Sequence, residues 1–204
     1  MQKLKRADIR IFGTATTPEE AQTLEAIGVD AIVCQGQEAG GHRGGFSSDD
    51  PLYSLLPLLM LAKQRVKVPL IAAGGIMDGR SVKVALLAGA KAVQLGTAFI
   101  TVSESGAHQT YKECLLKSEE PTKLTKAFTG KSARGIINDF MFKFGHCSLP
   151  QYPIQHFLTK KIRSLAAQCN RPDLMSLWAG QSYPLCQSIS ATELITQIAE
   201  DLTL

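Results

Sequence analysis

The chain has 204 residues and a formal net charge of +4, and 45% of its residues are hydrophobic against 20% that are charged. This composition is typical of a globular protein with a buried core and excludes a disordered or fibrous chain. The basic residues are scattered and no RNA- or DNA-binding motif accompanies them, so we expect no nucleic-acid partner.

The five cysteines stand far apart, with no Cys-x-x-Cys pair and no histidine at ligand spacing. Such a set favours a reducing compartment over a disulfide framework and predicts no metal site. The basic segment 1–13 lacks the apolar core of a secretory signal. The longest apolar run, residues 52–62, is too short to cross a bilayer. We therefore expect a cytoplasmic protein that does not enter a membrane.

Strand-like and helix-like segments alternate along the first hundred residues. Thr17 is a suitable N-cap, Pro18 suits the first helical position, and Gly28 can end the same helix. The strand segments are apolar almost throughout, as expected of strands covered on both faces. We expect strands at residues 9–15, 29–35, 68–76 and 91–100, and helices at residues 16–28, 52–65 and 78–90.

This alternation, with short junctions that contain glycine, predicts a parallel α/β sheet. A weak internal repeat supports it, because residues 26–33 and 87–94 share a small-residue helix end, a glycine and the start of a strand. No G-x-G-x-x-G follows the first strand, which disfavours a dinucleotide-binding Rossmann unit. We therefore predict an α/β fold of the (β/α) barrel type.

Beyond residue 100 the strand pattern stops and the predicted elements are helical. We expect these helices at residues 107–117, 122–128, 154–168, 172–178 and 191–202. A helical C-terminal region should therefore follow the barrel-like part.

Three of the predicted strands end in glycine-rich segments, at residues 35–45, 72–76 and 94–97. The carboxyl ends of barrel strands share one face, where active sites lie. Glycine lets backbone N–H groups approach a ligand, and helix N-termini add partial positive charge. We therefore predict a phosphate cradle from Gly74, Gly75, Gly96 and Thr97. The alternative, that glycine serves only the geometry of tight junctions, is weakened because two consecutive junctions share the feature.

His42 stands alone among the glycines of the segment QGQEAGGHRGG. A neutral imidazole can take a proton from a carbon acid near pH 7, which makes His42 a candidate base. We interpret Glu38 and Arg43 as a surface ion pair without a chemical role, and Cys34 as a small core residue. No motif of a serine hydrolase, a zinc protease or a nucleotide triphosphatase is present in the sequence.

Four segments, residues 13–46, 69–100, 128–136 and 178–181, together resemble the nitronate monooxygenase family, formerly called 2-nitropropane dioxygenases. The likeness runs from about Ile9 to the C-terminus, and the A-G-G-H segment at residues 39–42 is its most specific part. The resemblance implies a TIM barrel with a helical domain, FMN as the cofactor, and a nitroalkane or nitronate with O2 as substrates.

The resemblance also implies roles for individual residues. His42 would remove the α-proton of a nitroalkane, while FMN would carry the redox chemistry to oxygen. The flavin would be contacted by Gln35 and Gly40, and its phosphate end would be held by Gly75, Gln94, Leu95, Gly96 and Thr97, with Gly74 beside them in the predicted cradle.

A full (β/α)8 barrel needs about 200 to 250 residues before any additional domain, whereas this sequence shows four convincing strands. The resemblance implies that the chain begins at about the fifth strand. We therefore predict that residues 1–104 form the last four βα units of a TIM barrel and bind FMN. Residues 105–204 should form a helical C-terminal region.

Three hypotheses follow for the function of such a partial barrel. The first is a flavoenzyme completed by self-association or by a separately encoded N-terminal half. The second is an FMN-binding remnant without turnover, and the third is a truncated product that folds poorly. Within the enzyme class, the alternative activity is that of an FMN-dependent NAD(P)H reductase of the enoyl-acyl-carrier-protein or quinone reductase type.

Overall fold

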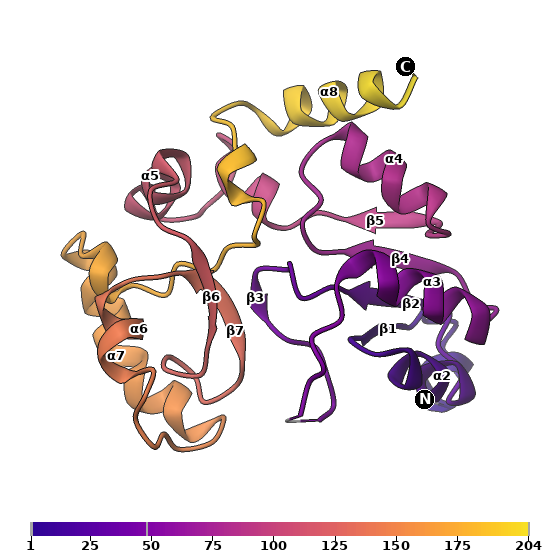
Figure 1. Cartoon of the computed structure of the whole chain (residues 1–204), viewed down its shortest axis with the longest axis horizontal. Helices are drawn as coiled ribbons and strands as arrows, with labels where there is room; N and C mark the ends of the chain where they lie inside the picture. Colours follow the sequence, from indigo (N-terminus) through magenta and orange to yellow (C-terminus); the bar gives the residue numbers. More distant parts are fainter. Residues whose placement is uncertain (1, 48, 204) are drawn as a thin grey trace. The chain divides into compact units, whose positions relative to one another are not determined.

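The computed structural model describes residues 2–47 and 49–203, which divide into two compact units. Unit 1 takes the chain up to Ala39, then Gly44–Leu95, and again from Ile195 onward, and unit 2 takes Gly40–Arg43 and Gly96–Leu194. Figure 1 shows the elements of both units along the chain. A division into domains at residues 1–104 and 105–204 stays a prediction.

Unit 1 contains a parallel sheet of four strands in the order β1-β2-β4-β5. Helix α2 packs against β1 and β2, α3 packs against β2 and β4, and α4 packs against β5 (Figure 1). The predicted alternation of strands and helices is confirmed. The strands are β1 (Phe12–Ala15), β2 (Ala31–Gln35), β4 (Leu70–Ala73) and β5 (Ala92–Gln94), and the helices are α1 (Gln2–Arg6), α2 (Pro18–Ala26), α3 (Leu55–Arg65) and α4 (Gly79–Leu87).

The start of α2 follows the predicted capping chemistry. The Thr17 hydroxyl accepts a hydrogen bond from the Glu20 backbone N–H at 3.1 Å, and Pro18 occupies the first helical position. The Glu20 carboxylate in turn accepts from the backbone N–H groups of Thr16 and Phe46, both at 2.6 Å. Gly28, just beyond the helix, has a φ of +86° that favours glycine.

The core of unit 1 lies between the sheet and these helices. Ile32, Leu58 and Leu59 are fully buried there, and Cys34 is a core residue as predicted. Burial raises the pKa of the Cys34 thiol to about 12, so it stays protonated. The central strands β2 and β4 are mostly buried, whereas Phe12 on the edge strand β1 is 63% exposed.

Unit 2 contains a three-stranded antiparallel sheet in the order β3-β7-β6. The helix α8 (Ala191–Thr203) begins in unit 2 and continues into unit 1. The strands are β3 (Gly41–His42), β6 (Thr122–Thr125) and β7 (Ala133–Ile136); the helices are α5 (Gln109–Lys117), α6 (Asp139–Phe144) and α7 (Ile154–Gln168), with 3₁₀ turns η1 (Thr97–Phe99), η2 (Pro172–Leu174) and η3 (Tyr183–Leu185).

The prediction that strands stop beyond residue 100 is wrong. Residues 122–128, predicted as a helix, begin with the strand β6, because Thr122, Leu124 and Thr125 suit a strand and pair with β7. Residues 172–178 form only the short turn η2 before the chain becomes extended at Met175. The helices α7 and α8 match the predictions for residues 154–168 and 191–202 within one residue.

None of the helices in the described ranges 2–47 and 49–203 is both long and apolar enough to span a membrane.

Candidate functional site

The predicted site residues of unit 1 lie at one edge of its parallel sheet. Gln35 ends β2 beside Ala73 of β4, and Ala73 lies beside Gln94, the last residue of β5. Gly74 follows Ala73 directly, so the carboxyl ends of three neighbouring strands meet as predicted. The Gln35 side-chain oxygen accepts a hydrogen bond from the Gly44 backbone N–H at 2.8 Å, which fixes the orientation of its amide.

The two glycines after β4 have backbone conformations that other residues rarely adopt. The φ angles are +121° at Gly74 and +71° at Gly75. A Cβ at Gly74 would lie only 3.1 Å from the backbone nitrogen of Ala39, so this junction is also tightly packed. Gly96, after β5, differs, because an added Cβ would meet no atom within 4 Å.

The N-terminus of α4 is already capped by a carboxylate. Asp78 accepts a hydrogen bond from the Ser81 backbone N–H at 2.8 Å, and the Ser81 hydroxyl accepts from the Asp78 N–H at 3.1 Å. A negative side chain here opposes a second anion. The expected contribution of helix N-termini to a phosphate cradle therefore finds no support at α4.

In unit 2, Gly40 and Thr97 approach the same backbone segment. A Cβ at Gly40 would lie 2.6 Å from the Gly180 nitrogen and 2.6 Å from the Ala179 carbonyl carbon, so only glycine fits. The Gly180 N–H donates a hydrogen bond to the Thr97 hydroxyl at 3.0 Å. These contacts give a structural reason for the glycine and for the segment WAGQ, to which sequence reasoning assigned no role.

His42 lies on β3 among aromatic side chains of unit 2. Its Nε2 is 2.9 Å from the Thr129 hydroxyl oxygen. The Trp178 ring lies at a centroid distance of 5.5 Å, and the Tyr152 ring stands edge-on at 6.5 Å. Trp178 is itself fixed by the buried Phe128 ring, which it meets edge-on at 5.3 Å.

The surroundings of His42 disfavour its charged form. Partial desolvation is the main cause, and electrostatic interactions with Lys131, His156 and Arg163 add to it, so the pKa of His42 lies below its ordinary value. Although the side chain is exposed to solvent, its imidazole is therefore mostly neutral at pH 7. A neutral imidazole can act as a base.

The interpretation of Glu38 and Arg43 as a surface ion pair is wrong. Arg43 is only 3% exposed, and its backbone N–H extends the β3–β7 pairing by donating to the Ser132 carbonyl oxygen at 2.9 Å. The Glu38 carboxylate is half-buried and accepts from the Leu55 N–H, at the start of α3, at 3.1 Å. Each residue thus has a structural role of its own.

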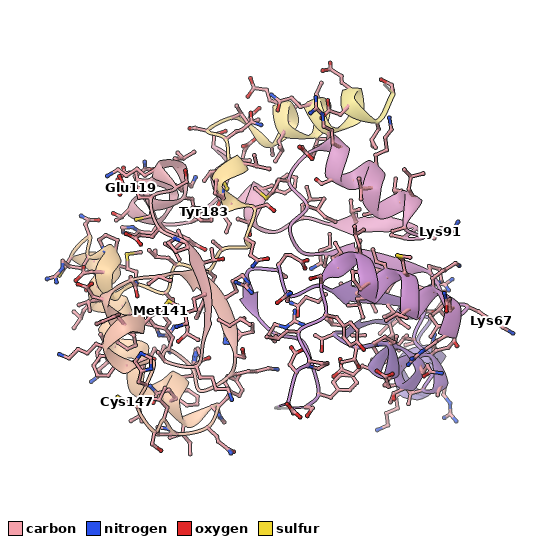
Figure 2. All side chains as sticks on the ribbon, viewed as in Figure 1. Lys67, Lys91, Glu119, Met141, Cys147 and Tyr183 are labelled. Carbon is pink, nitrogen blue, oxygen red and sulfur yellow. The ribbon has the colours of Figure 1, made fainter. Side chains whose placement is uncertain are left out.

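Unit 2 also encloses a cavity of about 620 Å³, which is within the range of small-molecule sites. It is bordered by β6, by α6 and by residues 145–151, and it contains Lys123 and Lys126. Figure 2 labels two of its lining residues, Met141 and Cys147. His42 and the other predicted site residues are not among the residues that line it.

Three residues of the His42 environment escaped sequence reasoning. Thr129 and Trp178 belong to FTGKSARGI and WAGQ, two of the segments that carry the family resemblance. The resemblance therefore pointed to these segments, but no role was assigned to either residue. Tyr152 carried no signal. Within residues 2–47 and 49–203, no group of three or more His, Cys, Asp or Glu side chains that could hold a metal ion occurs.

A parallel sheet whose strands are joined by helices and followed by glycines defines a protein of the α/β class. The model of the nitronate monooxygenase family matches residues 1–201. The chain belongs to the nitronate monooxygenase family.

Among curated relatives, the probable nitronate monooxygenase of Bacillus subtilis is 45% identical over 98% of this chain and 60% of its own length. That of Staphylococcus saprophyticus is 43% identical over 98% of this chain and 58% of its own length. The chain thus spans about 60% of the length of the relatives that it matches.

Two solved structures support the same relationship. The nitroalkane oxidase of Streptomyces ansochromogenes is 40% identical, with a TM-score of 0.96 over 99% of this chain and 60% of that one. FabK of Thermotoga maritima is 29% identical, with a TM-score of 0.84 over 100% of this chain and 64% of that one. The α/β fold therefore corresponds to part of the length of these proteins.

Proposed function

We propose that this chain carries the base and part of the flavin site of an FMN-dependent enzyme that oxidises nitroalkanes or nitronates with O2. The observation that best supports the proposal is the placement of His42, whose lowered pKa and aromatic surroundings suit a base for a carbon acid. The likeness to a nitroalkane oxidase at a TM-score of 0.96 supports the same reaction class.

The chemistry of the proposed base follows from its neighbours. The α-proton of a nitroalkane moves to the His42 imidazole, and the electron pair of the broken C–H bond spreads onto the nitro group as a nitronate. The positive charges of Lys131 and Arg163 repel imidazolium, and the same charges attract the anionic nitronate. The site thus lowers the affinity of the base for protons while stabilising the anion that it forms.

The glycine segments fit a bound flavin phosphate. The positive φ angles of Gly74 and Gly75 and the open space at Gly96 allow backbone N–H groups to approach a ligand without a side chain in the way. When bound, FMN supplies the redox chemistry between the nitronate and O2. The residues proposed to hold it are those that the family resemblance implies, together with Gly74: Gln35, Gly40, Gly74, Gly75, Gln94, Leu95, Gly96 and Thr97.

The edges of the parallel sheet suit completion by further strands. Phe12 on β1 is 63% exposed, and Ala92 and Gln94 on β5 are exposed, although both strands lie in a sheet whose centre is buried. Edge strands with exposed apolar residues favour pairing with another chain segment. We propose that a second copy or a separate polypeptide supplies those strands for turnover in the cytoplasm.

Flavin binding and oxygen uptake test this proposal. The purified chain is titrated with FMN while the visible absorption spectrum is recorded, and oxygen uptake is then measured with a nitronate, with the flavin-free chain as the control. We expect a perturbed flavin spectrum and nitronate-dependent uptake. A spectrum identical to that of free FMN, or turnover only with NADH and a quinone, would contradict the proposal; the second outcome would favour a reductase.

A further inference from the structure

The hydroxyl of Thr129 makes three polar contacts in the interior of unit 2. Thr129 is only 2% exposed. Its Oγ1 lies 3.1 Å from the Lys131 carbonyl oxygen, 3.3 Å from the Lys131 backbone nitrogen and 2.9 Å from the His42 Nε2. Because water has little access to this hydroxyl, these three groups decide where its hydrogen points.

The bonding capacity of a hydroxyl determines the direction of each contact. A threonine hydroxyl has one hydrogen to donate and two lone pairs to accept with. The Lys131 carbonyl can only accept, and the Thr129 hydroxyl donates its one hydrogen to it. The Lys131 N–H can only donate, and it uses one lone pair. The second lone pair then accepts from His42, which requires the hydrogen of the neutral imidazole to sit on Nε2.

The backbone that carries Thr129 is anchored by α7. The Gln155 side-chain amide donates to the Ala127 carbonyl oxygen at 2.7 Å, and the Thr159 hydroxyl donates to the Phe128 carbonyl oxygen. Gly130 follows with a φ of +80°, and its N–H donates to the Lys126 carbonyl oxygen at 2.8 Å. These bonds hold the turn that presents the hydroxyl, so the acceptor for Nε2–H has a defined position.

We propose that Thr129 is a positioning residue that holds His42 as the Nε2–H tautomer, so that Nδ1 is the nitrogen that takes the α-proton of the substrate. This inference rests on the proposed function. In the proton transfer, the C–H bond breaks, the proton binds Nδ1, and the electron pair remains on the nitronate. The Thr129 oxygen accepts from Nε2–H before and after the transfer, so the ring keeps one orientation throughout.

The tautomer can be measured without flavin or substrate. The chain is labelled with ¹⁵N-histidine, and the His42 signals are identified by their loss in His42→Asn. We expect a pyrrole-type Nε2 and a pyridine-type Nδ1 in the unsubstituted chain. Thr129→Val removes the acceptor and should give a mixture of tautomers, whereas Thr129→Ser keeps the hydroxyl and should keep the original pattern.

Turnover provides the second readout. Thr129→Val should lower kcat/KM for neutral nitroethane about 10- to 100-fold, as expected for loss of a hydrogen bond to a group that becomes charged, while preformed ethyl nitronate is oxidised as before. Thr129→Ser should stay near the unsubstituted chain. A protonated Nδ1 in the unsubstituted chain would overturn the inference, and this result does not depend on whether the valine variant folds. Identical ¹⁵N patterns in the valine and serine variants would overturn it as well. An FMN spectrum left unperturbed by the unsubstituted chain, together with the expected ¹⁵N pattern, would instead overturn the proposed function.

Discussion

The charges that act on His42 come from two segments of unit 2. Lys131 lies two residues after Thr129, and His156 and Arg163 lie on α7. Partial desolvation lowers the pKa of His42 first, and the electrostatic interactions of imidazolium with Lys131, His156 and Arg163 lower it further. At the scale of the residue, the lowered pKa that suits His42 to its proposed role as a base therefore comes from its surroundings and not from the imidazole itself.

Replacing Lys131 with methionine should move the pH profile of the reaction. A base works in its neutral form, so kcat/KM for a neutral nitroalkane falls as the pH drops through the pKa of His42. Removing one repelling charge raises that pKa, while His156 and Arg163 still act on it, so the acidic limb moves to higher pH. Lys123→Met, on the wall of the separate cavity, is the matched control and should leave the limb in place. A limb that stays or moves to lower pH in Lys131→Met would refute this electrostatic account.

Sequence reasoning reached His42 but not the residue that bonds to it. The isolated imidazole in a glycine-rich segment is visible in the sequence, and so are the glycines after the predicted strands. Thr129 stands 87 residues from His42, and the pairing of β3 with β7 brings the two together. Such a contact depends on non-local strand pairing, which a local pattern of side chains does not predict.

At the scale of the element, the junctions after β4 and β5 use glycine in different ways. At Gly74 the backbone has a φ of +121° and packs against Ala39, so glycine is needed for the fold. At Gly96 there is space for a side chain, so geometry alone does not require glycine. The second junction therefore separates the two interpretations of these glycines, tight turn or phosphate cradle.

Alanine substitutions at Gly74 and Gly96 should change different properties, the stability of the fold in one case and the affinity for FMN in the other. Gly74→Ala should lower the free energy of unfolding by about 1–3 kcal/mol because of its disfavoured backbone. Gly96→Ala should change it by less than about 0.5 kcal/mol but raise the Kd for FMN about tenfold or more, since the new Cβ would enter the space proposed for the phosphate. Thermal unfolding and FMN titration measure the two effects.

Gly106→Ala is a suitable control for this pair, because Gly106 is exposed, has equally open surroundings and lies outside the proposed flavin site. Its stability and FMN affinity should both match the unsubstituted chain. If Gly96→Ala bound FMN as well as Gly106→Ala does, glycine at the second junction would have no part in holding the cofactor.

The elements themselves were predictable to different degrees. Strands β2 and β4 and helix α7 have strong local patterns and appear close to the predicted residues. The strand β6 was mistaken for a helix because its short sequence, TKLT, has no decisive periodicity, and its pairing with β7 determines its conformation. No strand is predicted at the two-residue strand β3, since glycine and histidine have little strand propensity of their own.

At the scale of the whole molecule, each unit has hydrophobic clusters of its own, and unit 1 contains the parallel sheet. The core of unit 1 surrounds β2 and β4, and unit 2 has its own clusters, one built on Leu115 and Tyr183 and one on Phe128 and Phe140. The chain spans about 60% of the length of the relatives that it matches. Whatever completes the sheet, the proposed base and its positioning residue both lie within unit 2.

Comparing neutral nitroethane with preformed ethyl nitronate in the chain and in its His42→Ala variant tests the central claim most directly. The base is needed only to form the nitronate, so oxygen uptake with nitroethane should fall about 10²- to 10⁴-fold in the variant, while uptake with the nitronate should be preserved. Equal losses with both substrates, or full activity of the variant with nitroethane, would contradict the assignment of His42 as the base.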